Sequence, residues 1–328
     1  MAWIERHWQS ITPVSALLYP LSLLYGAVSS TRRTMASPVK LAVPVIVVGN
    51  ITAGGTGKTP LTLWLAEFLW ARGRTPGIVS RGYGGQPGAP RRVLPDSDPL
   101  ACGDEPVLLA RRSGCEVWTG ADRVAAAQAL LASRPACDVV LSDDGLQHYR
   151  LARDLEICVV DGERGFGNGW LLPAGPLREP PERLASINAM VVNGGARHAS
   201  IAHLPGGAPR LTMALEGREF RSLLNPRQTT GVHFFRGKRV HAVAGIGNPQ
   251  RFFSHLQALG LDFTAHPFPD HHRFAAADLA YAGSEAIVMT EKDAVKCKPF
   301  AAETHWELAV NAVLDPALGE LVLKKLGR

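Results

Sequence analysis

A glycine-rich segment that directly follows an apolar run is the part of the chain best suited to bind phosphate. The run Pro44–Asn50 (PVIVVGN) leads into ITAGGTGKTP. A loop of this composition points successive backbone N–H groups at phosphate oxygens, and the helix after it adds its positive end. In such a loop Lys58 contacts the β- and γ-phosphates, and the hydroxyl of Thr59 binds Mg²⁺. The candidate nucleotide-binding residues are Thr52, Ala53, Gly54, Gly55, Thr56, Gly57, Lys58 and Thr59.

One position of this segment departs from the usual phosphate-loop pattern. Glycine normally stands where this chain has Thr52, and the additional glycines Gly54 and Gly55 lie inside the loop. The departure leaves the geometry of the loop open. A glycine-rich turn that contains Gly-Lys-Thr by chance is the alternative, but the strand–loop–helix context favours nucleotide binding.

A second motif, DVVLSDD at Asp138–Asp144, ends in two acids that are candidate metal ligands together with Thr59. Carboxylates at the carboxyl end of a central parallel strand lie beside the phosphate loop, where Asp143 and Asp144 would hold Mg²⁺. A helix cap is the alternative role for such a pair. The guanine-reading pattern Asn/Thr-Lys-x-Asp has no exact match, since Thr290-Glu291-Lys292-Asp293 has one residue too many between Thr and Lys. We therefore expect ATP rather than GTP.

Three further turns carry groups that could act on a hydroxyl acceptor of phosphate. Asp104, in Gly103-Asp104-Glu105-Pro106, could accept a hydroxyl proton, although helix capping is the simpler role for an acid before proline. His271, in Asp270-His271-His272, could share or relay a proton with its acidic neighbour, or belong to a surface turn. Gln147-His148 could line the same site or only the wall of a loop. Arginines that could meet phosphate, or else form surface ion pairs, are Arg81, Arg123 and Arg178.

The elements that must position these groups alternate between strand and helix. Short β-branched runs are expected as strands at 43–48, 77–80, 138–142, 155–160 and 189–192, with helices at 60–72, 106–112 and 123–133. This alternation predicts a P-loop NTPase-type α/β/α sandwich around a parallel sheet. After the loop-rich residues 204–230, strands expected at 239–244, 263–268, 286–290 and 306–310 predict a second, smaller α/β domain. The expected organisation is an N-terminal segment 1–30, a phosphate-loop domain 31–225 and a C-terminal domain 226–328.

Composition excludes several classes of protein. The 328 residues are 46% hydrophobic and 20% charged, as in ordinary globular proteins rather than disordered chains or coiled coils. Five cysteines without CxxC spacing argue against a disulfide framework or a structural zinc site and fit a reducing compartment. The net charge of +6 suits an anionic partner such as a nucleotide or an anionic lipid surface. Nucleic acid is not expected, because no basic stripe with interleaved aromatic residues occurs.

The N-terminal segment is apolar and carries no charge from Gln9 to Thr31. Its core, Ile11–Val28, is marginal in length for a membrane-spanning helix and contains two prolines. Aromatic residues before and within it, followed by Arg32 and Arg33, favour a helix that lies in the membrane interface. A helix docked on the protein's own core, a spanning helix and a secretory signal are the alternatives.

Taken together, these motifs resemble the tetraacyldisaccharide 4′-kinase family, the lipid A 4′-kinases of bacteria with an outer membrane. The resemblance covers nearly the whole chain, and the unusual GGTGKT spacing combined with GDEP, DDGLQH and FPDHH is highly specific. The matching segments, in order, are VGNITAGGTGKTP, SRGYGG, GDEP, SDDGLQH, LPAGPLREP, AGIGNPQRFF, FPDHHRF and TEKDAVK.

The resemblance implies an ATP- and Mg²⁺-dependent transferase of lipid A biosynthesis. It would move the γ-phosphate of ATP to the 4′-hydroxyl of a tetraacylated glucosamine disaccharide 1-phosphate and form lipid IV A. It also implies two α/β/α domains joined by a short hinge, and a peripheral enzyme on the cytoplasmic face of the inner membrane. Asp104 resembles the family's base, paired with His271, and Lys58 completes the catalytic set. Candidate substrate residues by the same resemblance are Arg81, Tyr83, Glu105, Arg123, Gln147, His148, Arg178 and Glu179.

Two rival hypotheses fit parts of the sequence. A P-loop kinase or ligase with a soluble acceptor would need no lipid or detergent. A nucleotide-driven membrane switch or metallochaperone would hydrolyse ATP slowly and respond to a protein partner. No such partner is evident from the sequence, and the lack of a clustered Cys/His site speaks against the metallochaperone form.

Overall fold

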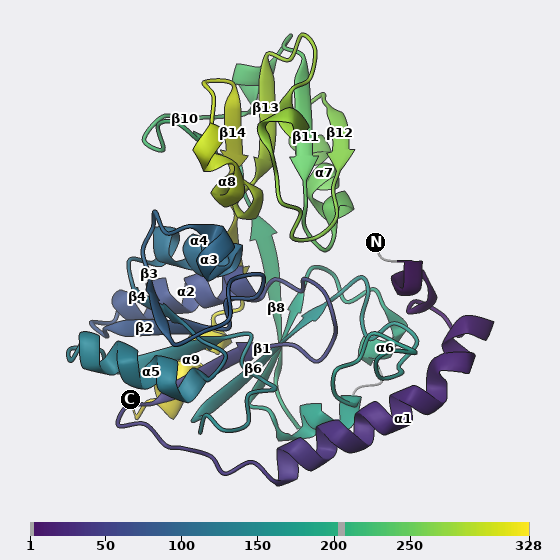
Figure 1. Cartoon of the computed structure of the whole chain (residues 1–328), viewed down its shortest axis with the longest axis vertical. Coiled ribbons are helices and arrows are strands. Elements are labelled where there is room, and N and C mark those ends of the chain that lie inside the picture. The colour runs from purple at the N-terminus through teal and green to yellow at the C-terminus, as the bar shows by residue number, and fades with distance from the viewer. Residues whose placement is uncertain (1–2, 203–206, 328) are drawn as a thin grey trace.

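The computed structural model describes residues 3–202 and 207–327, and in these residues two α/β units lie one above the other (Figure 1). The larger unit contains a nine-stranded sheet and the smaller unit a six-stranded sheet. In spatial order the strands of the larger sheet are β15 (Asn311–Leu314), β8 (Arg210–Glu216), β7 (Ala189–Asn193), β6 (Leu155–Asp161), β1 (Val45–Gly49), β5 (Val139–Asp143), β2 (Pro76–Ser80), β4 (Glu116–Thr119) and β3 (Arg91–Val93).

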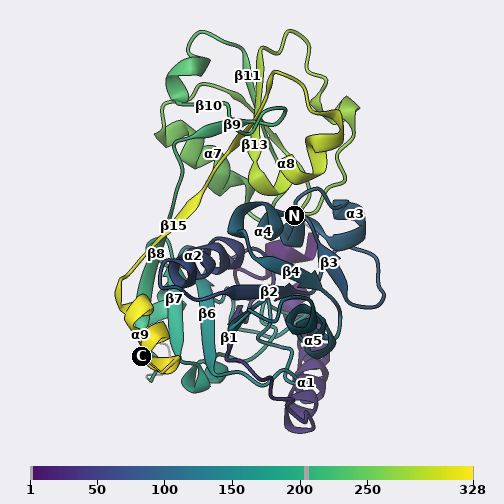
Figure 2. The same ribbon diagram turned by 90° about the vertical axis from the view of Figure 1, so that its left-hand side faces the viewer.

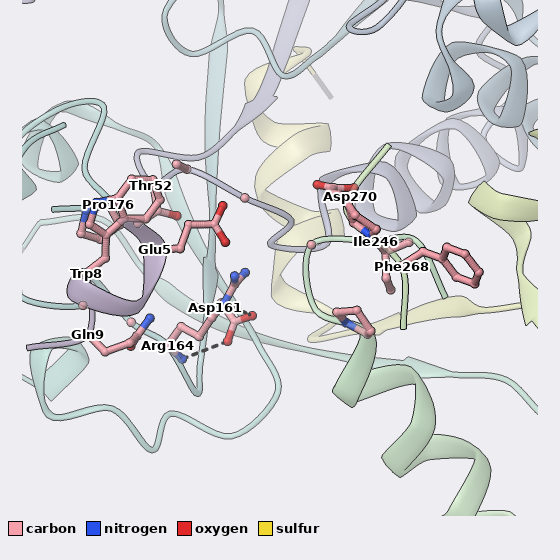
Figure 3. Close-up of a pocket in the computed structure, with 17 residues that line it drawn as sticks. Glu5, Trp8, Gln9, Thr52, Asp161, Arg164, Pro176, Ile246, Phe268 and Asp270 are labelled. Carbon is pink, nitrogen blue, oxygen red and sulfur yellow. Dashed lines mark hydrogen bonds and ion pairs between the residues drawn. The ribbon is translucent and has the colours of Figure 1, made fainter. Parts of the chain in front are cut away.

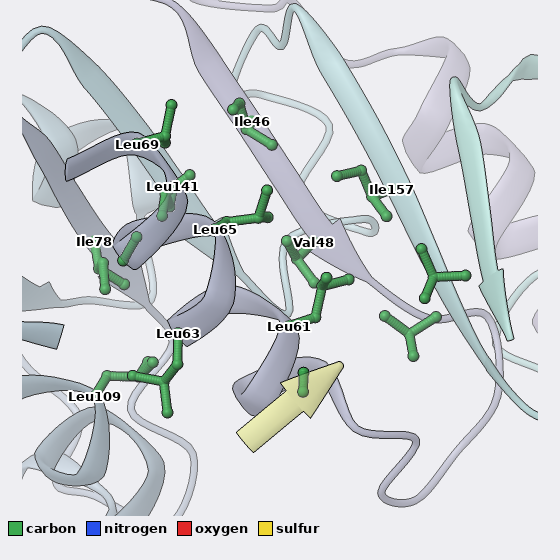
Figure 4. Close-up of a cluster of buried hydrophobic side chains, with 14 of the residues drawn as sticks. Ile46, Val48, Leu61, Leu63, Leu65, Leu69, Ile78, Leu109, Leu141 and Ile157 are labelled. Carbon is green, nitrogen blue, oxygen red and sulfur yellow. The ribbon is translucent and has the colours of Figure 1, made fainter. Parts of the chain in front are cut away.

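Both faces of the larger sheet are covered, which explains why its central strands are apolar at every position. Alternate residues of β1 enter opposite cores. Ile46 and Val48 pack beneath Leu61 and Leu65 of α2 (Figure 4), whereas Val45 and its alternate neighbours face the other layer. The first face is covered by α2 (Lys58–Trp70), α4 (Asp104–Ser113) and α9 (Ala317–Lys325), with the short α3 (Pro99–Cys102) beside α4. The second is covered by α5 (Arg123–Ser133), α6 (Ala199–Ala202) and the 3₁₀ helix η2 (Pro181–Ser186).

The order of the strands creates a crevice at the carboxyl end of β1. This strand pairs in parallel with β5 on one side and β6 on the other, and the chain reaches these two neighbours by separate crossovers. Ligands of open α/β sheets bind at such a switch in strand order, outside the carboxyl ends of the strands. The phosphate loop and the Asp143–Asp144 pair both lie at this edge, so the predicted P-loop α/β/α architecture is confirmed with its crevice in place.

The smaller unit repeats this design on a reduced scale. Its strands, in spatial order, are β10 (Thr229–Thr230), β9 (Phe220–Ser222), β14 (His305–Leu308), β13 (Ala286–Thr290), β11 (Val240–Ala244) and β12 (Thr264–Pro267). The helix α7 (Pro249–Ala258) covers one face, and α8 (Glu291–Cys297) covers the other. Short 3₁₀ helices complete it: η3 (Val232–Phe235), η4 (Ala276–Leu279) and η5 (Lys298–Phe300).

The chain crosses between the units twice, and this differs from the domain boundaries expected from the sequence. Strand β9 already belongs to the smaller sheet before residue 226, while β15 and α9 return to the larger unit. Figure 2 shows β15 and β8 side by side between the units. The return was not foreseen because β15 is a four-residue edge strand with a mixed burial pattern. Its pairing with β8 and the burial of Leu318 and Val322 in the larger core hold it there.

The N-terminal segment forms a 3₁₀ helix, η1 (Trp3–His7), and a long helix, α1 (Pro13–Thr34), while residues 1–2 of the expected segment 1–30 lie outside the described residues. By length and composition alone, α1 could cross a membrane. It lies along the larger unit (Figure 1). Its buried face is polar and its exposed face is apolar, the reverse of the usual arrangement. Ser15 and Ser22 face the protein, and the hydroxyl of Ser22 donates to Leu171 O at 2.8 Å. The opposite face exposes Leu17, Leu21, Leu24 and Val28.

Candidate active site

The phosphate loop connects β1 to α2, and two asparagines bind its backbone: Asn50, directly after β1, and Asn193, at the end of β7. Gly54 and Gly57 have φ angles of 93° and 99°, which glycine adopts without strain. A Cβ atom at Gly57 would lie 2.5 Å from Nδ2 of Asn193, which itself donates to Thr56 O at 2.9 Å. Asn50 donates to Gly54 O at 3.2 Å from the other side. The carbonyls of Gly54 and Thr56 are therefore occupied by protein donors, which suits a loop whose glycine-rich part offers its N–H groups to an anion.

The position of Thr52 resolves the departure from the usual motif. Among the residues that the structure describes, the non-glycine residues with positive φ are Asp144 and His271, so Thr52 has an ordinary backbone conformation. It is buried and pairs with Leu177 in an isolated antiparallel bridge, which the bond from Ala53 N to Pro176 O (2.7 Å) extends. Glycine is not required at this position, because the strand-like start of the loop accepts a side chain.

Two acids and a lysine converge beneath the loop. Lys58 Nζ lies 3.5 Å from Asp144 Oδ1, and Arg178 Nη1 lies 3.3 Å from the same carboxylate. Burial raises the pKa of Asp144, but the charges of Lys58 and Arg178 outweigh it and lower this pKa to about 2. Asp143 is fully buried, accepts a hydrogen bond from Thr62 at 3.0 Å, and has its pKa raised by burial and then by the Glu105 and Asp144 carboxylates.

This cluster fits a magnesium ion in chemistry. Within the described residues, Oδ2 of Asp143 is buried without a hydrogen-bond partner, which is costly for a carboxylate unless a cation or donor arrives. No group of three His, Cys, Asp or Glu side chains in the described parts of the chain could hold a metal alone. Magnesium instead uses one or two carboxylates together with hydroxyl, water and phosphate oxygens. Thr59, Asp143 and Asp144 supply that kind of donor set.

The structure brings Asp104 and His271 together from the two units. Asp104 begins α4 of the larger unit, and His271 lies in the loop after β12 of the smaller unit with a φ of 57°. Nδ1 of His271 is 3.1 Å from Oδ2 of Asp104. Burial raises the pKa of Asp104, but the hydrogen bond from His271 and the charges of Lys292 and Lys296 lower it to about 2. The carboxylate is therefore ionised at neutral pH.

Four of the candidate substrate residues make hydrogen bonds that support the loops of the site. Arg123 is buried, and its guanidinium donates to the backbone carbonyls of Gly120, Ala121 and Asp144. His148 accepts a hydrogen bond from the backbone N–H of Arg123 at 3.2 Å; burial and the Arg123 charge lower its pKa to about 4. Gln147 donates both to Asn50 O (3.0 Å) and to the buried Glu179 (2.7 Å). These contacts tie the loop after β5 to the phosphate loop.

The other candidate substrate residues lie nearer to the reacting groups. Tyr83 is exposed, with its ring centroid 4.9 Å from that of His271. Glu105 follows Asp104 and pairs with Lys292 of α8 at 3.1 Å. Arg178 contacts Asp144, as above, and Arg81 is exposed at the end of β2. The eight candidate substrate residues therefore fall into two groups. Those that support loops are Arg123, Gln147, His148 and Glu179. Those that keep polar groups near the site are Arg81, Tyr83, Glu105 and Arg178.

A cavity of about 460 Å³ opens between the units beside the phosphate loop. Figure 3 shows Ile246 and Asp270 of the smaller unit across the cavity from Thr52, Asp161 and the N-terminal Glu5 and Trp8. Phe268 lines the same cavity. The sequence analysis did not identify Asp161 or its partner Arg164, whose guanidinium also donates to Gly55 O. Asp161 directly follows a predicted strand, as Asp143 does. The sequence analysis also missed Arg251 of α7, which reaches Asp161 at 3.4 Å from the other unit.

Comparison with known proteins agrees with this geometry. The family model for tetraacyldisaccharide-1-P 4′-kinase matches residues 14–327. A tetraacyldisaccharide 4′-kinase from Azoarcus sp. (strain BH72) is 52% identical over 99% of this chain and 96% of its own. Another, from Pseudomonas aeruginosa (strain LESB58), is 48% identical over 96% and 93%. The crystal structure of LpxK from Aquifex aeolicus in complex with ATP superimposes with a TM-score of 0.80 at 27% identity, covering 95% of this chain and 99% of that one. The chain belongs to the tetraacyldisaccharide-1-phosphate 4′-kinase family.

Proposed function

We infer that this chain is an ATP-dependent lipid kinase that phosphorylates the 4′-hydroxyl of tetraacyldisaccharide 1-phosphate, a step of lipid A biosynthesis that yields lipid IV A. Family membership over the full length supports the substrate. The observation that carries the chemistry is the meeting of two half-sites. The phosphate loop and Asp270, the neighbour of His271, line one cavity between the units. The Asp104–His271 pair forms where the two units touch.

The larger unit binds and polarises the nucleotide in this proposal. The N–H groups of the loop and the ammonium of Lys58 hold the β- and γ-phosphates. Thr59, Asp143 and Asp144 would hold Mg²⁺, which neutralises charge on the phosphates when it is bound. Arg178 keeps the Asp144 carboxylate in place and ionised. In phosphoryl transfer, such positioning and charge neutralisation supply most of the catalysis.

The Asp104–His271 pair activates the acceptor in this proposal. The 4′-oxygen bonds to the γ-phosphorus while the bond to the β–γ bridging oxygen breaks, and the hydroxyl proton passes to the pair. An ionised carboxylate with a pKa near 2 is a weak base. It suffices because the transition state is loose and the hydroxyl loses its proton late. Since each unit supplies one member, closure of the units completes the site and limits transfer to water.

The acylated acceptor places the enzyme at a membrane surface. The leucine face of α1 offers apolar side chains to lipid, and the arginines at its carboxyl end suit anionic headgroups. The serine contacts on its other face keep α1 on the protein, so we propose a helix that lies in the interface rather than one that spans the bilayer. A peripheral position on the cytoplasmic face of the inner membrane follows from the need for ATP.

The proposal is tested by phosphate transfer in mixed micelles. Purified protein, Mg²⁺, γ-labelled ATP and tetraacyldisaccharide 1-phosphate are incubated, and the lipid is extracted. We expect label in a bis-phosphorylated lipid. Transfer to a soluble sugar acceptor with equal efficiency would refute the lipid substrate. Release of label only as inorganic phosphate, from protein shown to bind ATP, would favour the nucleotide-driven switch.

A further inference from the structure

A lysine of the smaller unit, Lys292 on α8, lies where the two units meet at the Asp104–His271 pair. Its Nζ is 3.1 Å from Glu105 Oε1, 3.3 Å from Asp270 Oδ1 and 3.4 Å from Nε2 of His271. Glu105 belongs to the larger unit and the other two partners to the loop after β12. The ammonium therefore contacts both neighbours of the pair as well as the imidazole itself.

The ammonium of Lys292 determines which ring nitrogen of His271 carries the hydrogen. A lysine ammonium has three donors and no acceptor, and three acceptors surround it here. Nε2 of a neutral His271 must accept from Lys292, so the ring hydrogen is on Nδ1. Nδ1 is the atom that faces Asp104 at 3.1 Å. The contact thus selects the tautomer that donates to the carboxylate.

The environment of Lys292 keeps it charged and in place. Its side chain is only 15% exposed. Burial lowers its pKa, but the carboxylates of Glu105, Asp104 and Asp270 together raise it above the ordinary lysine value. The start of α8 is fixed by Thr290, whose hydroxyl accepts from the backbone N–H of Asp293 at 3.1 Å. A charged donor on a capped helix is a rigid support for a neighbouring ring.

The second lysine of this helix has a different role. Lys296 lies one turn further on, pairs with Asp293 of its own helix at 2.8 Å, and stands 3.8 Å from Asp104 Oδ2. Its ammonium adds positive charge beside the Asp104 carboxylate, and its ion pairs are with Asp104 and Asp293. Among the described residues, contact with His271 Nε2 therefore distinguishes Lys292 from its neighbour.

We propose that Lys292 is a positioning residue that holds His271 in the Nδ1–H tautomer, with Nδ1 directed at Asp104. It does so only when its ammonium is bound by Glu105 of the larger unit and by Asp270 of the smaller unit. The inference rests on the proposed lipid kinase function and deepens it. The acceptor-activating pair would be correctly protonated in the closed arrangement and free to rotate or change tautomer in the open one. Closure would then control the state of the pair as well as its distance.

The test combines kinetics with a direct measurement of the tautomer. Lys292→Met removes the donor, Lys292→Arg retains one, and Lys298→Met is the control, because Lys298 is exposed on the same segment. We expect Lys292→Met to lower kcat about 10- to 100-fold, as misplacement of a catalytic group does, with KM for ATP changed less than threefold. Lys292→Arg should recover part of the loss, and Lys298→Met should match wild type.

Nitrogen-15 spectra of histidine-labelled protein report which ring nitrogen carries hydrogen, with His271→Gln used to assign the signal. We expect a protonated Nδ1 in wild type and an averaged or reversed pattern in Lys292→Met. An unchanged tautomer, or a kcat within twofold of wild type, overturns the proposal. If Lys292→Met fails to fold, the same spectra of Lys292→Arg and Lys292→Leu decide, since only the leucine lacks a donor and should alter the tautomer. Wild-type protein with the expected tautomer but without lipid phosphorylation would refute the proposed function and leave the positioning inference standing.

Discussion

Removing the exposed leucines of α1 should release the protein from membranes without unfolding it. Leu17, Leu21 and Leu24 are 80%, 53% and 63% exposed and lie on one face, opposite the buried Ser15 and Ser22. Their combined exposure equals about two fully exposed leucine side chains. At about 2 kcal/mol for each leucine moved from water into lipid, the face contributes roughly 4 kcal/mol. Because each 1.4 kcal/mol is about tenfold, the triple change to serine should weaken partitioning by up to about 1,000-fold.

The assay is co-sedimentation of the protein with phospholipid vesicles that contain anionic lipid, at several total lipid concentrations. We expect a loss of at least about 30-fold, which allows for a helix that enters the interface only to half its width. Leu21→Ser alone is compared with Leu224→Ser, because Leu224 of the smaller unit is exposed to the same degree, 54%. ATP binding and the melting temperature should not change in any variant. Equal, small losses for Leu21→Ser and Leu224→Ser would refute the assignment of this face to the membrane.

Three further predictions concern the site and its support. Lys58→Met should reduce phosphate transfer by at least about 10²-fold, because an ammonium beside the transferring phosphate is lost; near-normal turnover would contradict its place in the loop. In a double-mutant cycle, Asp104→Asn and His271→Gln should show a coupling in kcat of about 1.5–3 kcal/mol, the range for a charge-assisted hydrogen bond, whereas multiplicative losses would mean that the two act independently. Burial and the nearby Glu291 raise the pKa of Glu307 to about 7, so the folded state prefers its neutral form. This contribution is complete below the unfolded pKa of about 4.3 and is lost as pH rises through 7. Glu307→Gln should therefore raise the melting temperature at pH 8 and leave it nearly unchanged at pH 4, and an increase of equal size at both values would rule out titration as the cause.

Most of the larger unit could be predicted from the sequence because its central strands are buried on both faces of the sheet. Such strands appear as unbroken apolar runs, and β1, β5 and β6 were each predicted to within two residues at either end. The helix after the loop was predicted from Pro60, yet it begins at Lys58. Proline fits there because N–H groups of the first helical turn have no partner in the helix. Edge strands such as β15 escaped notice, since their burial pattern depends on a neighbour far along the chain.

The site was predictable where a motif is local and not where it is assembled across the units. The phosphate loop and the Asp143–Asp144 pair each lie within one segment. Lys292 was noted in a failed guanine motif and in the family-like segment TEKDAVK, but it was given no role, because its partner Glu105 lies 187 residues away. Arg123 presented the opposite difficulty. Its charge suggested phosphate, whereas its burial and its three backbone acceptors are visible only in the fold.

The double crossing between the units also sets an order for synthesis. The strand β15 and the helix α9 are translated after the entire smaller unit, although they belong to the nucleotide-binding sheet. Domains of a growing chain generally fold as they emerge. Here the smaller unit can close its core first, while the larger sheet waits with β8 as an open edge and with the pocket for Leu318 and Val322 unfilled. A chain released at residue 310 would thus carry a complete smaller unit on an incomplete phosphate-binding unit, with an exposed strand edge suited to aggregation or to capture by chaperones.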